Sequence, residues 1–161
     1  MKIKTIVDED FTNYKKPSMY IGTAQCSGKC CIEAGIPLSV CHNDGWRKSA
    51  TIEMADSEII TRYISNDITR AICFAGLEPF EQFSELYAFI VAFRNMYKRN
   101  DDIVIYTGYD KDEIEEQIKL LSVFENIIVK FGRYLPGYEP HYDEILGVNL
   151  ASGNQYAEVI S

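Results

Sequence analysis

The sequence predicts an α/β fold, a partial and open TIM-like barrel of βα units around a mostly parallel sheet. Short apolar runs of strand length alternate with longer segments whose apolar residues have helical spacing. About four such units are present, too few to close an eight-stranded barrel. The 161 residues contain no internal repeat, low-complexity tract or linker, so a single domain over residues 1–161 is expected.

The predicted strands are short runs bounded by turn residues or charges. In chain order they span 18–23, 70–75, 102–107 and 127–130. Their apolar character is continuous, as expected for parallel strands that are buried on both faces. The loops that follow them should meet at one edge of the sheet, where ligands bind in folds of this class.

The predicted helices lie between these strands, over 57–64, 80–97 and 110–121. Ser57 is a candidate N-cap for the first. In the third, Asp110 precedes Glu113 at the spacing of a capping box. The longest, 80–97, carries an apolar stripe at helical intervals and should pack on the sheet.

The charge pattern narrows the possible functions. The formal charge is −8 and no basic stripe stands out, which argues against a nucleic-acid partner. Residues 1–10 alternate charged and aliphatic side chains, so we expect neither a signal peptide nor a membrane span. A cytoplasmic location follows as an expectation, and there clustered cysteines favour metal binding over disulfides.

Four of the five cysteines fall in one short segment, at Cys26, Cys30, Cys31 and Cys41. The spacing lacks the two Cys-x2-Cys pairs that structural zinc sites commonly use. Three thiolates suit a [4Fe-4S] cluster in which one iron has no protein ligand. Zinc or plain buried thiols remain alternatives at this point, and Cys73 is expected to be a core thiol within a strand.

Five motifs follow one another along the chain. They are the cysteine loop ending in Cys41-His-Asn, Phe74-Ala-Gly-Leu-Glu-Pro, Ile105-Tyr-Thr-Gly-Tyr, Phe131-Gly-Arg-Tyr and Ser152-Gly-Asn-Gln. In this order they resemble the radical S-adenosylmethionine (SAM) family, most closely the small activating proteins of anaerobic (class III) ribonucleotide reductase. The resemblance covers most of the chain after Met19.

The cysteine loop departs from the family pattern Cys-x3-Cys-x2-Cys. The third cysteine would fall at Glu33, so the resemblance implies Cys26, Cys30 and Cys41 as ligands of a loop with an insertion. Cys31 is the alternative ligand, in place of Cys30. In the Gly-Gly-Glu-Pro turn of the family, Leu77 replaces the second glycine.

The resemblance implies a [4Fe-4S] cluster that binds SAM at its open iron and cleaves it reductively to a 5′-deoxyadenosyl radical. Glu78 would accept a hydrogen bond from the SAM ammonium group. The other implied cofactor-binding residues are Gly76, Asn43, Thr107, Gly108 and Arg133.

The resemblance also implies partners: a large glycyl radical enzyme, with anaerobic ribonucleotide reductase first, and an electron donor such as a flavodoxin or ferredoxin. The alternatives are a radical SAM enzyme with another substrate, and a non-catalytic iron–sulfur or zinc protein of the same fold.

Overall fold

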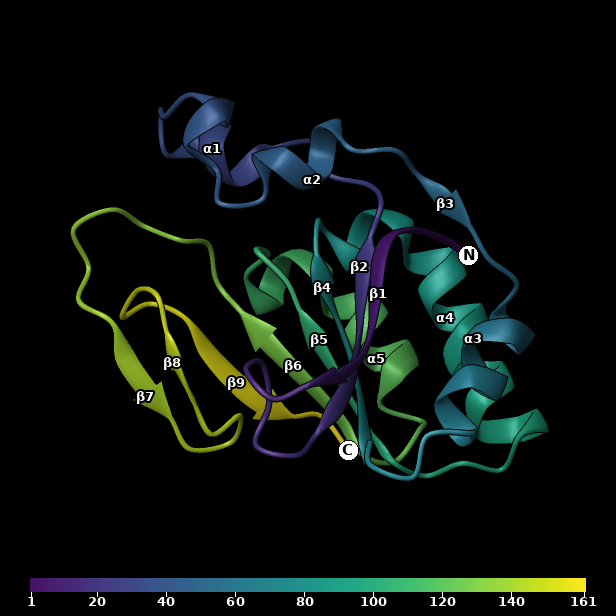
Figure 1. The fold of residues 1–161 in the computed structure, drawn as a ribbon. Coiled ribbons are helices and arrows are strands. Elements are labelled where there is room, and N and C mark those ends of the chain that lie inside the picture. Colours follow the sequence, from purple (N-terminus) through teal and green to yellow (C-terminus); the bar gives the residue numbers. More distant parts are fainter.

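The computed structural model describes residues 1–161, which form a seven-stranded mixed sheet and a separate two-stranded hairpin (Figure 1). The order in the large sheet is β3-β1-β2-β4-β5-β6-β9. The strands are β1 (Lys2–Asp10), β2 (Ser18–Thr23), β3 (Ile52–Glu53), β4 (Ala71–Gly76), β5 (Asp102–Tyr106), β6 (Ile127–Phe131), β7 (His141–Asp143), β8 (Val148–Leu150) and β9 (Tyr156–Val159).

The helices are short. They are α1 (Lys29–Glu33), α2 (Asp44–Lys48), α3 (Asp56–Ile64), α4 (Phe83–Val91) and α5 (Glu115–Leu121), with the turns η1 (Leu38–Val40), η2 (Pro79–Gln82), η3 (Ala92–Met96) and η4 (Lys111–Ile114). Helices α4 and α5 are each preceded by a 3₁₀ turn, and α4 is followed by a π-helical turn.

All four predicted strands and all three predicted helices are present, with small shifts at their ends. Asp110 and Glu113 form the expected capping box. The N-cap prediction at Ser57 was wrong, because α3 already begins at Asp56 with Ala55 as its N-cap.

The predicted partial TIM-like barrel with a mostly parallel sheet was wrong. Only the pairs β2–β4, β4–β5 and β5–β6 are parallel, whereas β1–β2, β1–β3 and β6–β9 are antiparallel. The sheet stays open because β3 and β9 lie at opposite edges and do not pair with each other. Antiparallel strands from the two ends of the chain flank the parallel centre, and the sequence analysis assigned no strand to either end.

The two faces of the sheet are covered differently. Helices α3, α4 and α5 lie on one face (Figure 1) and enclose a core of 21 buried residues that includes Met19, Phe74 and Phe89. The other face carries a smaller cluster under the β7–β8 hairpin and the β1–β2 loop, with Cys73 fully buried in it, as expected. The segment that contains α1 and α2 covers the carboxyl ends of the parallel strands.

No helix in the structure combines the length and the apolar character that a membrane-crossing segment requires.

Candidate metal and cofactor site

The cysteine segment, residues 24–48, leaves β2 and lies across the carboxyl ends of the parallel strands (Figure 1). Its first turn depends on Gly28, which has a φ of 78° and precedes α1. A Cβ at this position would lie 2.3 Å from Leu38 Cδ2. Glycine therefore allows the two halves of the segment to pack together.

The first half of the segment is fixed by the turn that follows β4. The side-chain oxygen of Gln82 accepts hydrogen bonds from the backbone N–H groups of Ala24 and Gln25. The carboxylate of Glu81 accepts two more from Ser27, at 2.6 Å each. The sequence analysis missed both residues, although they directly follow the Glu78 motif.

The structure gathers four thiols in this segment, and all five cysteines of the chain are free. The Cys26 sulfur accepts a hydrogen bond from the Gly28 N–H at 3.3 Å, and burial raises the pKa of Cys26 to about 11. Burial raises the pKa of the Cys31 thiol to about 11, and the neighbouring thiols of Cys30 and Cys41 act in the same direction.

Five of the predicted site residues line one pocket at the sheet edge: Cys26, Cys30, Glu78, Gly108 and Arg133. Lys29, Glu81 and Tyr109 complete its wall. The free volume is about 20 Å³, room for about one water molecule.

The donor atoms fit a soft metal centre, because thiolates are the ligands that hold iron–sulfur clusters. No three Cys, His, Asp or Glu side chains converge here in a geometry that encloses a metal ion. Binding of a cluster by three thiolates therefore requires the cysteine side chains to rearrange.

Glu78 is the buried carboxylate of the pocket, with 8% of its surface exposed. Its Oε1 accepts hydrogen bonds from the Thr107 hydroxyl at 2.7 Å and the Phe80 N–H at 3.1 Å, and Oε2 accepts one from Gly108 N–H at 2.9 Å. Burial raises the pKa of Glu78, although these three donors act in the opposite direction. The side chain is thus held rigidly.

Thr107 and Gly108, both predicted to bind a cofactor, position Glu78. Gly108 also lies on the pocket floor between Glu78 and Cys30. A Cβ on Gly108 would lie 3.6 Å from Glu78 Oε2 and 4.0 Å from Cys30 Cβ. An alanine side chain at position 108 would therefore occupy the space between Glu78 and Cys30, which glycine leaves free.

Asn43 and Gly76 are brought together at one side of the site. The Asn43 side-chain amide donates to the Gly76 carbonyl, which fixes the end of the cysteine segment to the end of β4. Gly76 has a φ of 85°, and a Cβ there would lie 3.1 Å from Gly22 Cα and 3.2 Å from the Tyr20 hydroxyl. The glycine is required by backbone conformation and by close approach.

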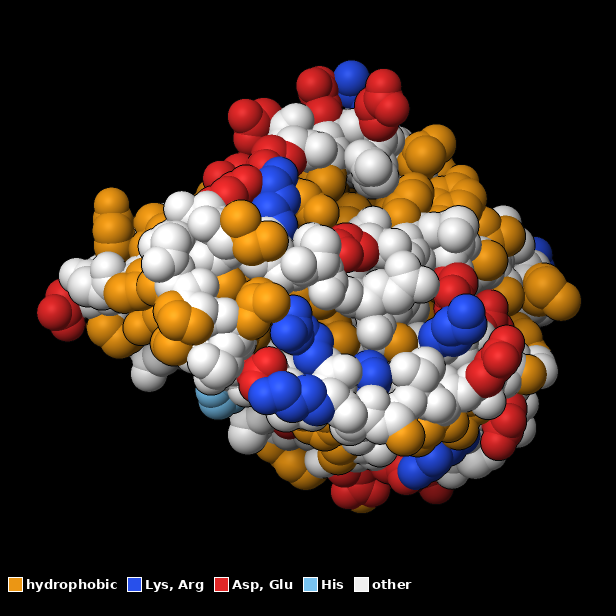
Figure 2. Space-filling view, turned by 90° about the horizontal axis from the view of Figure 1, so that it is seen from above, with side chains coloured by type: hydrophobic (Ala, Val, Ile, Leu, Met, Phe, Trp, Pro, Cys, Tyr) orange, Lys and Arg blue, Asp and Glu red, His pale blue; other side chains and the backbone are white.

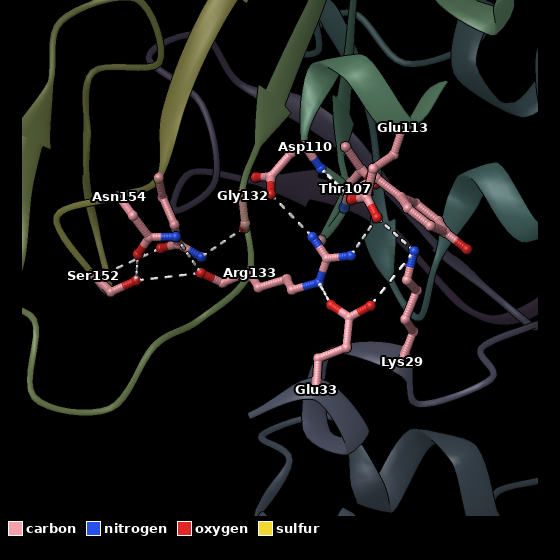
Figure 3. A network of polar contacts seen from close by, with 12 residues as sticks. Lys29, Glu33, Thr107, Asp110, Glu113, Gly132, Arg133, Ser152 and Asn154 are labelled. Atoms are coloured by element: carbon pink, nitrogen blue, oxygen red, sulfur yellow. Dashed lines mark hydrogen bonds and ion pairs between the residues drawn. The ribbon is translucent and has the colours of Figure 1, made fainter. Parts of the chain in front are cut away.

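Arg133 is predicted to bind a cofactor, and it is surrounded by carboxylates (Figure 3). Its Nε lies 2.5 Å from Glu33, its Nη1 3.2 Å from Asp110 and its Nη2 2.7 Å from Glu113. Lys29 joins the network at 2.5 Å from Glu113. The hydrogen bond from Arg133 is the main reason that the pKa of Glu113 falls to about 2.

This network connects the cysteine segment to the strand ends, since Lys29 and Glu33 belong to α1. Glu33 lies three residues after Cys30, where a Cys-x2-Cys spacing would place a cysteine. Its carboxylate forms an ion pair with Arg133.

The Ser152-Gly-Asn-Gln motif lies beside the backbone that follows β6 and hydrogen-bonds to it (Figure 3). The amide of Asn154 donates to the Arg133 carbonyl at 2.8 Å, and that of Gln155 donates to the Gly132 carbonyl at 3.3 Å. Ser152 in turn donates to Asn154 at 2.6 Å. The motif thus fixes the backbone of Gly132 and Arg133, which is a structural role for its side chains.

Lys130 is a site residue that the sequence analysis missed. It belongs to β6, is 6% exposed, and its ammonium donates to the carbonyls of Gly132 at 2.7 Å and Thr107 at 3.4 Å. Burial lowers its pKa to about 8. The signal was present in the sequence, because a lysine in an otherwise apolar strand is rarely buried without a reason.

Comparison with known proteins gives one result at the level of the family. A family model described as a 4Fe-4S single cluster domain matches residues 24–142, well over half of the chain. The match begins at the cysteine segment and extends beyond the strand ends that line the pocket. Neither the curated proteins nor the solved structures contain a match.

Proposed function

We propose, from the premise that this chain belongs to the 4Fe-4S single cluster domain family, that it is a radical SAM enzyme that activates a glycyl radical enzyme. When bound, a reduced cluster with one iron free of protein ligands supplies the electron that cleaves the carbon–sulfur bond of SAM, giving methionine and a 5′-deoxyadenosyl radical. The chain itself provides the ligands, the orientation of SAM and the exclusion of water.

The observation that carries the proposal is the placement of Glu78 beside Cys26 and Cys30 in one pocket. Its Oε2 accepts a single hydrogen bond, from Gly108, and so has room for a second donor. An ammonium group that approaches through the pocket would form a charge-assisted hydrogen bond there. Glu78 would thus orient the amino acid part of SAM while the cysteines hold the cluster.

The other predicted site residues hold Glu78 and the cysteine segment in place. Thr107 and Gly108 hold the carboxylate, and Asn43 and Gly76 fix the loop that carries the thiols. In this proposal Cys26, Cys30 and Cys41 are the ligands, with Cys31 as the alternative to Cys30. Arg133 lines the same pocket, and a SAM carboxylate would have to displace Glu33 to reach it.

A macromolecular substrate is favoured by the surface around the pocket. Ile32, Val40, Tyr134 and Tyr138 are each at least half exposed, at 68%, 61%, 50% and 55%. Figure 2, which looks onto this side of the molecule, shows hydrophobic side chains gathered beside the cysteine segment. Exposed hydrophobic side chains beside a narrow pocket suit a protein partner better than a small molecule.

The test is made on protein reconstituted anaerobically with iron and sulfide. Reduced wild-type protein should produce 5′-deoxyadenosine from SAM, and Glu78→Gln should lose most of that activity while keeping its iron content. Glu116→Gln, an exposed glutamate on α5 with no partner in the site, is the matched control.

A glycyl radical signal on an anaerobic ribonucleotide reductase, generated by wild-type protein with SAM and a flavodoxin or ferredoxin, would support the activase assignment. Production of 5′-deoxyadenosine without that signal would favour a different substrate. A normal cluster with no cleavage of SAM would contradict the enzyme assignment and leave a non-catalytic iron–sulfur protein.

A further inference from the structure

Lys130 has a charge that no carboxylate neutralises. Its ammonium is buried against two backbone carbonyls, those of Thr107 and Gly132, and makes no ion pair. Burial of an unpaired charge is costly, and a protein commonly compensates for it with an opposite charge nearby. The other two cations of the site, Lys29 and Arg133, are already paired with Glu33, Asp110 and Glu113.

The residues next to the Lys130 contact belong to the pocket. Gly108 directly follows Thr107, and a Cβ on it would lie 3.6 Å from Glu78 Oε2 and 4.0 Å from Cys30 Cβ. Thr107 connects Lys130 to Glu78. Its carbonyl accepts a hydrogen bond from Lys130, and its hydroxyl donates one to Glu78. Lys130 therefore lies behind the pocket wall, within electrostatic reach of a proposed cluster ligand and of the proposed SAM contact.

We propose that Lys130, in its protonated form, is the buried positive charge that raises the reduction potential of the cluster bound at Cys26 and Cys30. A cluster held by three thiolates is anionic, and reduction adds one further negative charge. A buried cation nearby favours the reduced form, because its field is weakly screened at such a site. The inference rests on the proposed function only for the position of the cluster.

The experiment is a redox titration of the reconstituted cluster, followed by electron paramagnetic resonance in the absence of SAM. Lys130→Met should shift the midpoint potential to more negative values. The expected size is a tenfold change in the reduction equilibrium, which for one electron corresponds to about 59 mV. Lys130→Arg, which keeps the charge, should stay close to wild type.

The matched control separates the charge from the hydrogen bond. Gln155 donates to the same Gly132 carbonyl as Lys130 but is neutral. Gln155→Met should lower the thermal stability and leave the potential unchanged. If Lys130→Met does not bind the cluster, Lys130→Gln retains a donor for the carbonyl and takes its place in the titration.

The proposal is overturned if the neutral Lys130 variant has the wild-type potential, or if Gln155→Met shifts it equally. These results are independent of SAM chemistry, since neither SAM nor a partner is added. A protein that fails to cleave SAM but shows the shift would refute the proposed enzyme activity and leave the role of Lys130 intact.

Discussion

Glu33 and Arg133 face each other across the mouth of the pocket, with Oε2 of the glutamate 2.5 Å from Nε of the arginine. One belongs to the cysteine segment and the other follows β6, so their ion pair closes the segment onto the strand ends. The Glu33 side chain is 45% exposed and that of Arg133 10%, so the glutamate end of the pair is open to water and the pair stabilises the contact only weakly.

Glu33→Gln should loosen the cysteine segment without unfolding the protein. Exposed ion pairs contribute about 0–1 kcal/mol, so the free energy of unfolding should change little. Amide hydrogen exchange over Lys29–Glu33 should become faster. Glu115→Gln breaks the exposed pair with Lys119 at 2.9 Å and is the matched control, which should leave exchange in the segment unchanged. Equal exchange in wild type and Glu33→Gln would show that the pair does not hold the segment.

The ligand set can be read from single cysteine variants. Cys26→Ala, Cys30→Ala and Cys41→Ala should each lose the cluster, measured as iron and sulfide per chain after anaerobic reconstitution. Cys31→Ala should keep it. Cys73→Ala, in the core of the sheet, is a control for the effect of losing a buried thiol. Retention by Cys30→Ala together with loss in Cys31→Ala would transfer the ligand role to Cys31.

Gly108→Ala should close the floor of the pocket. The added methyl group would contact both Glu78 and Cys30 at ordinary van der Waals distance, so the fold and the cluster should be retained. Binding of SAM, measured by its effect on the paramagnetic spectrum of the reduced cluster, should weaken at least tenfold, about 1.4 kcal/mol. Gly45→Ala, where a Cβ meets nothing within 4 Å, is the control. Unchanged binding would mean that the ligand does not pass over Gly108.

The stability of the apo-protein should depend on Glu113 in acid. Its pKa is lowered to about 2 in the folded state, mainly by Arg133, whereas an unfolded glutamate titrates near about 4.3. The ionised carboxylate therefore stabilises the fold above the unfolded pKa, and this contribution is lost as the pH falls toward 2. Urea unfolding from pH 7 to pH 3 should show the difference between wild type and Glu113→Gln shrinking. A constant difference would show that the shift is absent.

The central strands were predictable because their residues are buried on both faces and form continuous apolar runs. β1 and β9 were missed for the opposite reason: each lies toward an edge, and Tyr156 and Val159 of β9 are exposed. Pairing of such strands depends on contacts far along the chain, which a local pattern does not contain. The barrel prediction failed at these strands.

The site was predictable where the rule for strand ends applies, so that Cys26, Glu78 and Gly108 do meet in one pocket. The partners of these residues were not predictable. Glu33 is a hundred residues from Arg133 in the sequence, and the Thr107 carbonyl that accepts from Lys130 is 23 residues from it. Ion pairs of this sort follow from tertiary structure and have no local signature.

The side-chain amides of Asn154 and Gln155 donate to the Arg133 and Gly132 carbonyls, so the pocket depends on residues near the C-terminal end of the sequence. The matched segment ends at residue 142, before the residues that brace the last wall of the pocket. A chain cut at that boundary would also lack β9, leaving the outer edge of β6 without its partner. Removal of residues 143–161 is therefore expected to free the backbone of Gly132 and Arg133 as well as the outer edge of β6.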